Sequence, residues 1–273
     1  MRDPVEKYQE NISEIRLAVL IDADNISHQN IKGMMEEIAR YGNPTIKRIY
    51  GDWTKPNLSG WKPLLLDYAI TPIQQFGYTT GKNSTDSALI IDAMDILYTE
   101  QADGFCLVSS DSDFTRLAIR LREAGKTVYG IGEQKTPNAF IAACDKFIYL
   151  EILEERMQAE AESESGQQTA DTDQKVAVRQ TSQPAKKKTT FRKIGPDVVK
   201  LITTTIRDVE DDNGWAYLGE VGSLLLKKQP SFDPRNFGFE KLTPMIKSIG
   251  RFEIEARPTG HASSKHIYIR VKS

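Results

Sequence analysis

The segment Val108-Ser109-Ser110-Asp111-Ser112-Asp113-Phe114 joins two stretches of different hydrophobic pattern. Residues 104–108 are a short apolar run, which predicts a buried strand, and residues 114–121 have the spacing of an amphipathic helix. Asp111 and Asp113 therefore lie where a strand passes into its helix. Because ligands bind at this carboxyl edge in open α/β sheets, the two carboxylates are candidate site residues.

Further acidic residues are predicted near the same edge. A second apolar run, residues 17–21, ends in Asp22-Ala23-Asp24-Asn25, and Asp86 begins a helical pattern. Carboxylates gathered from separate segments repel one another, and a divalent cation is the simplest reason to assemble them. Mg²⁺ and Mn²⁺ prefer carboxylate oxygens and bridge to phosphate, which suits phosphodiester hydrolysis. For any single Asp, a helix-capping or turn role is the alternative.

Strand-like and helix-like segments alternate over residues 16–150. The predicted strands are residues 17–22, 45–50, 70–75, 105–109, 127–131 and 147–150, and the clearest helices are residues 30–41, 86–98 and 114–124. This alternation predicts βαβ units, hence an α/β fold with a parallel sheet and helices on both faces.

The remaining chain predicts a linker and a second, small domain. Residues 157–190 are polar and close with Lys186-Lys187-Lys188, so they are predicted to be a disordered linker between domains at 1–156 and 191–273. The second domain contains helical patterns at 197–208, 218–228 and 240–249, followed by alternating strands at 251–256 and 266–271. Three short helices and a hairpin are the outline of a winged helix.

The charge is distributed unevenly between the two predicted domains. Residues 1–156 hold 17 Lys and Arg against 23 Asp and Glu, whereas residues 190–273 hold 14 against 10. An acidic head and a basic tail favour metal binding by the first domain and contact with a polyanion by the second.

Cellular location is predicted from what the chain contains. Cys106 and Cys144 both lie in apolar surroundings without CxxC spacing, and no apolar stretch approaches the ~18 residues that a membrane helix needs. We therefore expect a cytoplasmic protein that does not bind membranes.

The acidic elements resemble those of a known family. The stretches Leu20-Ile21-Asp22-Ala23-Asp24-Asn25, Lys82-x-x-x-Asp86 and Val108–Phe114 are similar to the three signatures of NYN domains, in the PIN-like superfamily of metal-dependent ribonucleases. The resemblance covers about residues 15–150. It implies catalytic and metal-ligating roles for Asp22, Asp86, Asp111 and Asp113. Asn25 matches the family's Asn and is expected to bind substrate.

Two further residues are expected to contact substrate. Lys82 could contact a phosphate group, and Trp53, which follows the second strand, could stack on a base. A solvated lysine and a core or rim aromatic are the corresponding structural alternatives.

The C-terminal segment resembles the OST-HTH, or LOTUS, domain. The similarity runs from Gly214-Trp215-Ala216-Tyr217-Leu218 through Asn236-Phe237-Gly238-Phe239 to Ile267-Tyr268-Ile269-Arg270. The family is associated with RNA binding and in some cases with protein partners. Phosphate contacts are expected from the basic residues near helix ends, which are Lys227, Lys228, Arg235, Lys241 and Lys247.

Together these features predict a metal-dependent ribonuclease acting on single-stranded RNA, with an RNA-binding tail. Two alternatives stay open. One is a non-catalytic RNA-binding regulatory protein. The other is a metal-dependent phosphatase, since Asp22-Ala23-Asp24 also resembles the Asp-x-Asp of haloacid-dehalogenase-like enzymes, although Ile26 matches that pattern poorly.

Overall fold

The computed structural model describes residues 14–76, 84–154, 191–258 and 265–272. The predicted linker, residues 157–190, and Lys82 lie outside the described residues.

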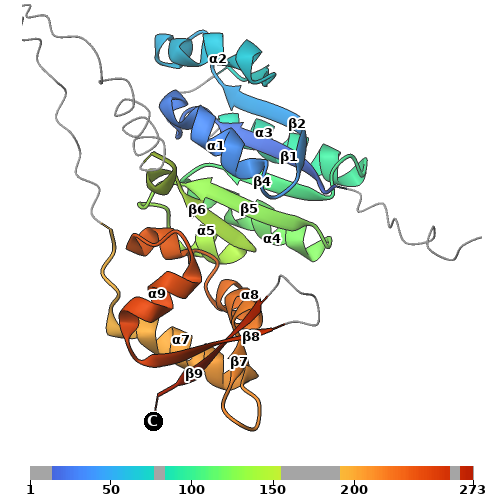
Figure 1. Cartoon of the computed structure of the whole chain (residues 1–273). Coiled ribbons are helices and arrows are strands. Elements are labelled where there is room, and N and C mark those ends of the chain that lie inside the picture. The colour runs from blue at the N-terminus through green and yellow to red at the C-terminus, as the bar shows by residue number, and fades with distance from the viewer. Residues whose placement is uncertain (1–13, 77–83, 155–190, 259–264, 273) are drawn as a thin grey trace, which may run out of the picture. The chain divides into compact units, whose positions relative to one another are not determined.

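The first domain is built on a six-stranded sheet (Figure 1). Its strands are β1 (Arg16–Asp22), β2 (Asn43–Gly51), β3 (Thr71–Gln74), β4 (Gly104–Val108), β5 (Thr127–Gly132) and β6 (Lys146–Tyr149), in the order β3-β2-β1-β4-β5-β6. β1 pairs in parallel with β2 and β4, β2 with β3, and β4 with β5. All six predicted strands are confirmed, with ends shifted by at most two residues.

The central strands are buried because their sequences are apolar throughout. Every residue of β4 is buried, and so is every residue of β1 after Arg16. Continuous apolar runs of this kind are typical of parallel strands covered on both faces. From β1 the chain winds outward to β2 and β3, then crosses back to β4. The carboxyl ends of β1 and β4 therefore flank the point where the strand order reverses, which is the usual ligand-binding crevice of such sheets.

Helices cover the two faces of this sheet, as predicted (Figure 1). They are α1 (Ile31–Ile38), α2 (Lys62–Asp67), α3 (Ser84–Tyr98), α4 (Thr115–Glu123) and α5 (Asn138–Ala143). α3 makes the crossover from β3 to β4, so its first turn lies near the end of the sheet at which β4 finishes. The six-residue helices α2 and α5 were not predicted, because so short a segment shows too little periodicity.

The second domain combines α7 (Pro196–Val209), α8 (Leu218–Lys228) and α9 (Leu242–Ile249) with a three-stranded antiparallel sheet. The strands β7 (Ala216–Tyr217), β8 (Phe252–Pro258) and β9 (Lys265–Val271) are arranged in the order β7-β9-β8. The predicted three helices and hairpin are confirmed, and the two-residue strand β7 is an addition. Side chains from all three helices and from the sheet form one core, in which Ile202, Val221, Ile246 and Ile269 are fully buried.

Candidate metal centre

Asp111 and Asp113 are held by the turn between β4 and α4. After β4 the chain enters a 3₁₀ helix at Ser112–Phe114, and Asp111 caps it by accepting a hydrogen bond from the backbone N–H of Asp113 at 2.9 Å. Asp113 lies in the first turn of this 3₁₀ helix, directly before α4. Asx capping of this kind fixes the Asp111 side chain at the sheet edge, and so its capping role and a ligand role coexist.

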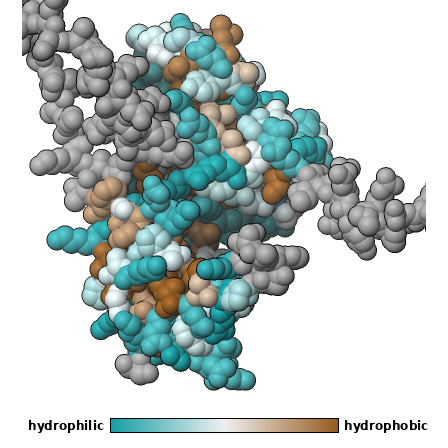
Figure 2. All heavy atoms as spheres, in the orientation of Figure 1, coloured by the Kyte–Doolittle hydropathy of each residue, from teal (hydrophilic) through white to brown (hydrophobic). Residues whose placement is uncertain are grey.

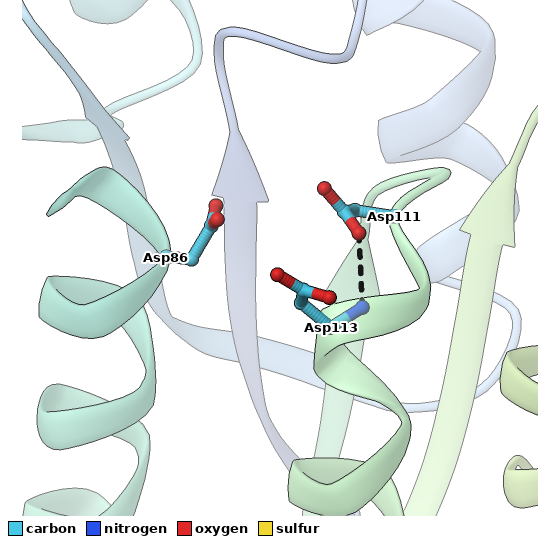
Figure 3. Close-up of side chains that lie close together, drawn as sticks. All are labelled: Asp86, Asp111 and Asp113. Atoms are coloured by element: carbon cyan, nitrogen blue, oxygen red, sulfur yellow. Dashed lines mark hydrogen bonds between the residues drawn. The ribbon is translucent and has the colours of Figure 1, made fainter. Parts of the chain in front are cut away.

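Asp86 approaches these residues from the first turn of α3. Among the described residues, Asp86, Asp111 and Asp113 form a group in which one carboxylate oxygen from each lies within 4.8 Å of the others (Figure 3). Asp86 is only 9% exposed, Asp111 is half-buried and Asp113 is exposed. We call this group the acidic triad.

The electrostatics of the acidic triad are those expected of a cation site. The pKa of Asp86 is raised to about 6, first by burial and then by the negative charges of Asp22, Asp111, Asp113 and Asp24. A divalent cation among the three carboxylates would stabilise the ionised form of Asp86 and so oppose this rise in its pKa. The oxygen donors and their spacing fit Mg²⁺ or Mn²⁺.

Asp22 lies at the expected edge of the sheet but is more deeply buried than the three residues of the acidic triad. It ends β1 on the same sheet edge, but it lies outside the acidic triad and is 0% exposed. Its carboxylate accepts hydrogen bonds from the Asn25 side chain at 2.6 Å, from Ser109 Oγ at 2.8 Å and from the backbone N–H of Asp24 at 3.1 Å. Burial raises its pKa, and these bonds partly oppose that rise. The Asp22 carboxylate is therefore held in place by three hydrogen-bond donors.

This burial also bears on the phosphatase alternative. An Asp that attacks a phosphoryl group must be reachable by substrate, and the Asp22 carboxylate is enclosed by its hydrogen-bond donors. The geometry of Asp22 disfavours such a role.

Ser109 is a residue that the sequence did not single out. Its hydroxyl donates to Asp22 and accepts the backbone N–H of Asp111 at 3.1 Å, and so it ties the end of β1 to the turn carrying the triad. In the sequence, the one indication of this role is that Ser109 lies between the last residue of β4 and Asp111. A serine there is too common to be recognised without coordinates.

Asn25 and Trp53, which are both proposed to contact substrate, make hydrogen bonds to other parts of the first domain. Asn25 is half-buried and is engaged with Asp22. The Trp53 indole N–H donates to the carbonyl of Ile73 at 3.0 Å, which fastens Trp53 to β3. Asp24 is exposed and accepts from Thr85 Oγ1 at 3.1 Å, linking the loop after β1 to the first turn of α3.

The five basic residues proposed in the second domain divide into two groups. Lys228 forms an ion pair with Asp208, and Arg235 is bound through several hydrogen bonds to Asp233, which caps the 3₁₀ helix Pro234–Phe237. Lys227, Lys241 and Lys247 are exposed and have no ion pair among the described residues. Of the five, these three therefore carry a charge that no described acidic residue compensates.

The second domain has a surface groove of its own. An open groove of about 720 Å³ in the second domain is lined by residues of α7 and of the end of α9, none of them acidic. On the face drawn in Figure 2, hydrophilic and apolar side chains are interspersed over this domain. No helix within the described ranges is long and apolar enough to cross a membrane.

Two family models match the chain, one over each domain. The model described as NYN domain matches residues 16–151, and that described as OST-HTH/LOTUS domain matches residues 191–263. No curated protein matches.

Solved structures give partial matches. A crystal structure of a protein of unknown function from Vibrio parahaemolyticus is 19% identical, covers 50% of this chain and 93% of its own, and has a TM-score of 0.42. A solution NMR structure of an uncharacterised protein from Nitrosomonas europaea is 33% identical over 37% of this chain and 93% of its own, with a TM-score of 0.28. A solution NMR structure of residues 175–257 of a Chromobacterium violaceum protein is 36% identical over 30% of this chain and 87% of its own, with a TM-score of 0.24.

Proposed function

Because the chain carries an NYN domain followed by an OST-HTH/LOTUS domain, we propose that it is a metal-dependent ribonuclease that hydrolyses phosphodiester bonds of single-stranded RNA. The two domain types support a ribonuclease-type function. The proposal of metal-dependent hydrolysis rests on the acidic triad, which lies where the strand order of the sheet reverses.

Asp86, Asp111 and Asp113 are the residues that would hold Mg²⁺ or Mn²⁺. When bound, the cation would activate water and offset charge on the phosphate oxygens. The protein's own contribution is to position the three carboxylates. Asp111 is fixed by its cap to the Asp113 N–H and by Ser109, while Thr85 anchors the start of α3 to the loop after β1.

The proposed division of labour follows the charges. The acidic head holds the metal, and the basic second domain binds RNA through Lys227, Lys241 and Lys247, with residues 157–190 as the connection. Tethering raises the local RNA concentration at the head. A protein partner of the second domain and a cytoplasmic location are part of the proposal.

The test is cleavage of end-labelled single-stranded RNA by the purified full chain with Mn²⁺, Mg²⁺ or EDTA. Asp111→Asn keeps the side-chain size but removes the ligand charge, so we expect the rate to fall by at least ~100-fold. Asp95→Asn is the matched control, because Asp95 is an exposed residue of the same helix as Asp86 but lies outside the triad.

Two results would contradict the proposal. Cleavage that is unaffected by EDTA would exclude metal dependence. An intact chain that binds RNA but does not cut it with either metal would point to the non-catalytic RNA-binding protein instead.

A further inference from the structure

The outer face of the small sheet in the second domain carries an unusual concentration of rings and guanidinium groups. Along β9, Ile267, Ile269 and Val271 pack against the domain core. Because side chains alternate along a strand, His266, Tyr268 and Arg270 lie on the opposite, outer face. Tyr217 of β7 pairs directly with Tyr268, and Arg257 of β8 pairs with His266, so these residues share that face.

These side chains lie against one another in a continuous row. The Arg270 guanidinium lies 4.7 Å from the ring centre of Trp215, and Arg257 lies 5.2 Å from Trp215 and 4.3 Å from Tyr268. Tyr217 continues the row, with its ring centre 5.8 Å from that of Tyr268 and 4.8 Å from that of His266, and its ring is tilted by 51° and 41° against them. We call Trp215, Tyr217, Arg257, His266, Tyr268 and Arg270 the aromatic row.

The end of this row at Tyr217 and His266 remains open to solvent. Tyr217 is 38% exposed and His266 is exposed. One side of the Tyr217 ring lies against Gly219, where an added Cβ would come within 2.7 Å of the ring. The glycine lets the ring lie flat on the domain surface.

The charges of this face are largely compensated. Arg257 is paired with Glu255 and Arg270 with Glu253. Phosphate attraction is therefore weak here, and what the face offers is a set of flat surfaces. Single-stranded nucleic acids stack their bases on aromatic rings and on guanidinium planes, and proteins that read single-stranded RNA commonly use such a sheet face.

Building on the proposed RNA-binding role of this domain, we propose that the outer face of the β7-β9-β8 sheet is a base-stacking platform for single-stranded RNA, on which Tyr217 and His266 receive unpaired bases. The platform binds bases, and the free lysines of the domain bind the backbone. Duplex RNA has its bases stacked internally and gains nothing from this face.

The test measures RNA binding by the full chain in EDTA, using fluorescence anisotropy with a labelled oligouridylate of about 20 nucleotides and a duplex of equal length. Tyr217→Leu removes the flat ring but keeps an apolar side chain, and we expect it to weaken oligouridylate binding by about ten-fold. Tyr217→Phe should stay within about two-fold of wild type, since it keeps the ring. Tyr98→Leu, at an exposed tyrosine of α3 in the head, should leave binding unchanged.

Salt dependence separates stacking from charge. Removing a ring should leave the slope of log K against log salt unaltered, whereas removing one phosphate contact to a single strand lowers its magnitude by about 0.7. Thermal unfolding of each variant checks that the domain remains folded.

The proposal is overturned if Tyr217→Leu binds like wild type, if Tyr217→Phe is as weak as Tyr217→Leu, or if the duplex binds as tightly as the single strand. None of these results contradicts the proposed nuclease activity. That activity is tested separately, by measuring metal-dependent cleavage of a short RNA at saturating concentration with the Tyr217→Leu variant. A wild-type chain that does not bind oligouridylate even at low salt would reject the platform and the RNA-binding tail together.

Discussion

At the scale of single residues, the acidic triad is assembled at a cost to the metal-free protein. Asp86 is nearly buried and faces four other carboxylates, and its pKa of about 6 lies above the ordinary value of 3.8. The ionised form is thus less favourable in the folded state than in the unfolded chain. Stability from this group is highest below the unfolded pKa and is lost as the pH rises through about 6.

Asp86→Asn should therefore stabilise the metal-free protein at pH 7.5 while removing its response to Mn²⁺. We expect a rise in Tm of about 2–4 °C without metal, and the rise should vanish near pH 4, where Asp86 is protonated. Differential scanning fluorimetry with and without Mn²⁺ measures both effects. Asp95→Asn should neither raise the metal-free Tm nor remove the response to Mn²⁺. A fall in the metal-free Tm of Asp86→Asn would contradict the repulsion between Asp86 and the neighbouring carboxylates.

Ser109 gives a second prediction at this scale. Ser109→Ala removes the donor to the buried Asp22 carboxylate and the acceptor for the Asp111 N–H. We expect a destabilisation of about 1–3 kcal/mol from the unsatisfied carboxylate and a loss of about ten-fold in Mn²⁺-dependent cleavage. Ser112→Ala, in the same turn but exposed, is the control. Equal effects of the two changes would show that Ser109 has no special positioning role.

At the scale of elements, helix ends in the second domain depend on backbone conformation. Gly250 ends α9 with φ of +71°, and an added Cβ would meet nothing within 4 Å. Any cost of Gly250→Ala is therefore conformational, at about 1 kcal/mol. In contrast, Gly222 lies inside α8, where a Cβ would make only an ordinary 3.6 Å contact with Leu242.

The two glycines should thus respond with opposite sign to the same substitution. Gly250→Ala is expected to destabilise and Gly222→Ala to stabilise, the latter by up to about 1 kcal/mol from helix propensity. Urea denaturation of the full chain, followed through the transition of this domain, measures both. Destabilisation by Gly222→Ala would mean that α8 and Leu242 are packed more tightly than the 3.6 Å contact indicates.

At the scale of the whole molecule, affinity and chemistry are expected to reside in different domains. Replacing Lys241 and Lys247 together by Gln removes two exposed charges from the second domain without touching the head. We expect KM for a long single-stranded RNA to rise while kcat is unchanged, and the magnitude of the slope of log K against log salt to fall by about 1.4. Steady-state kinetics and a salt titration measure these. Lys32→Gln, at an exposed lysine of α1 in the head, is the control, and an equal rise in KM there would place RNA recognition in the head instead.

The sequence by itself determined the succession of strands and helices along the chain. Short apolar runs such as residues 17–21 and 104–108, each followed by a helical pattern, predict buried parallel strands. The acids that follow such strands emerge at one edge of the sheet. The winged-helix outline followed from local periodicity in the same way. The short elements α2, α5 and β7 were not assigned from the sequence, because six residues make fewer than two helical turns and a two-residue strand shows no alternation.

Only the tertiary structure decided which side chains meet. The register of β1 against β4, with Ile21 opposite Val108, brings Ser109 beside Asp22, so Asp22 is buried among donors while Asp86 completes the triad. Likewise, the structure shows that Lys228 is paired with Asp208 and Arg235 with Asp233, whereas Lys227, Lys241 and Lys247 have no ion pair among the described residues. A sequence lists ionisable groups in order, but the distance between groups on different elements, which governs their pairing and repulsion, is fixed only when those elements pack.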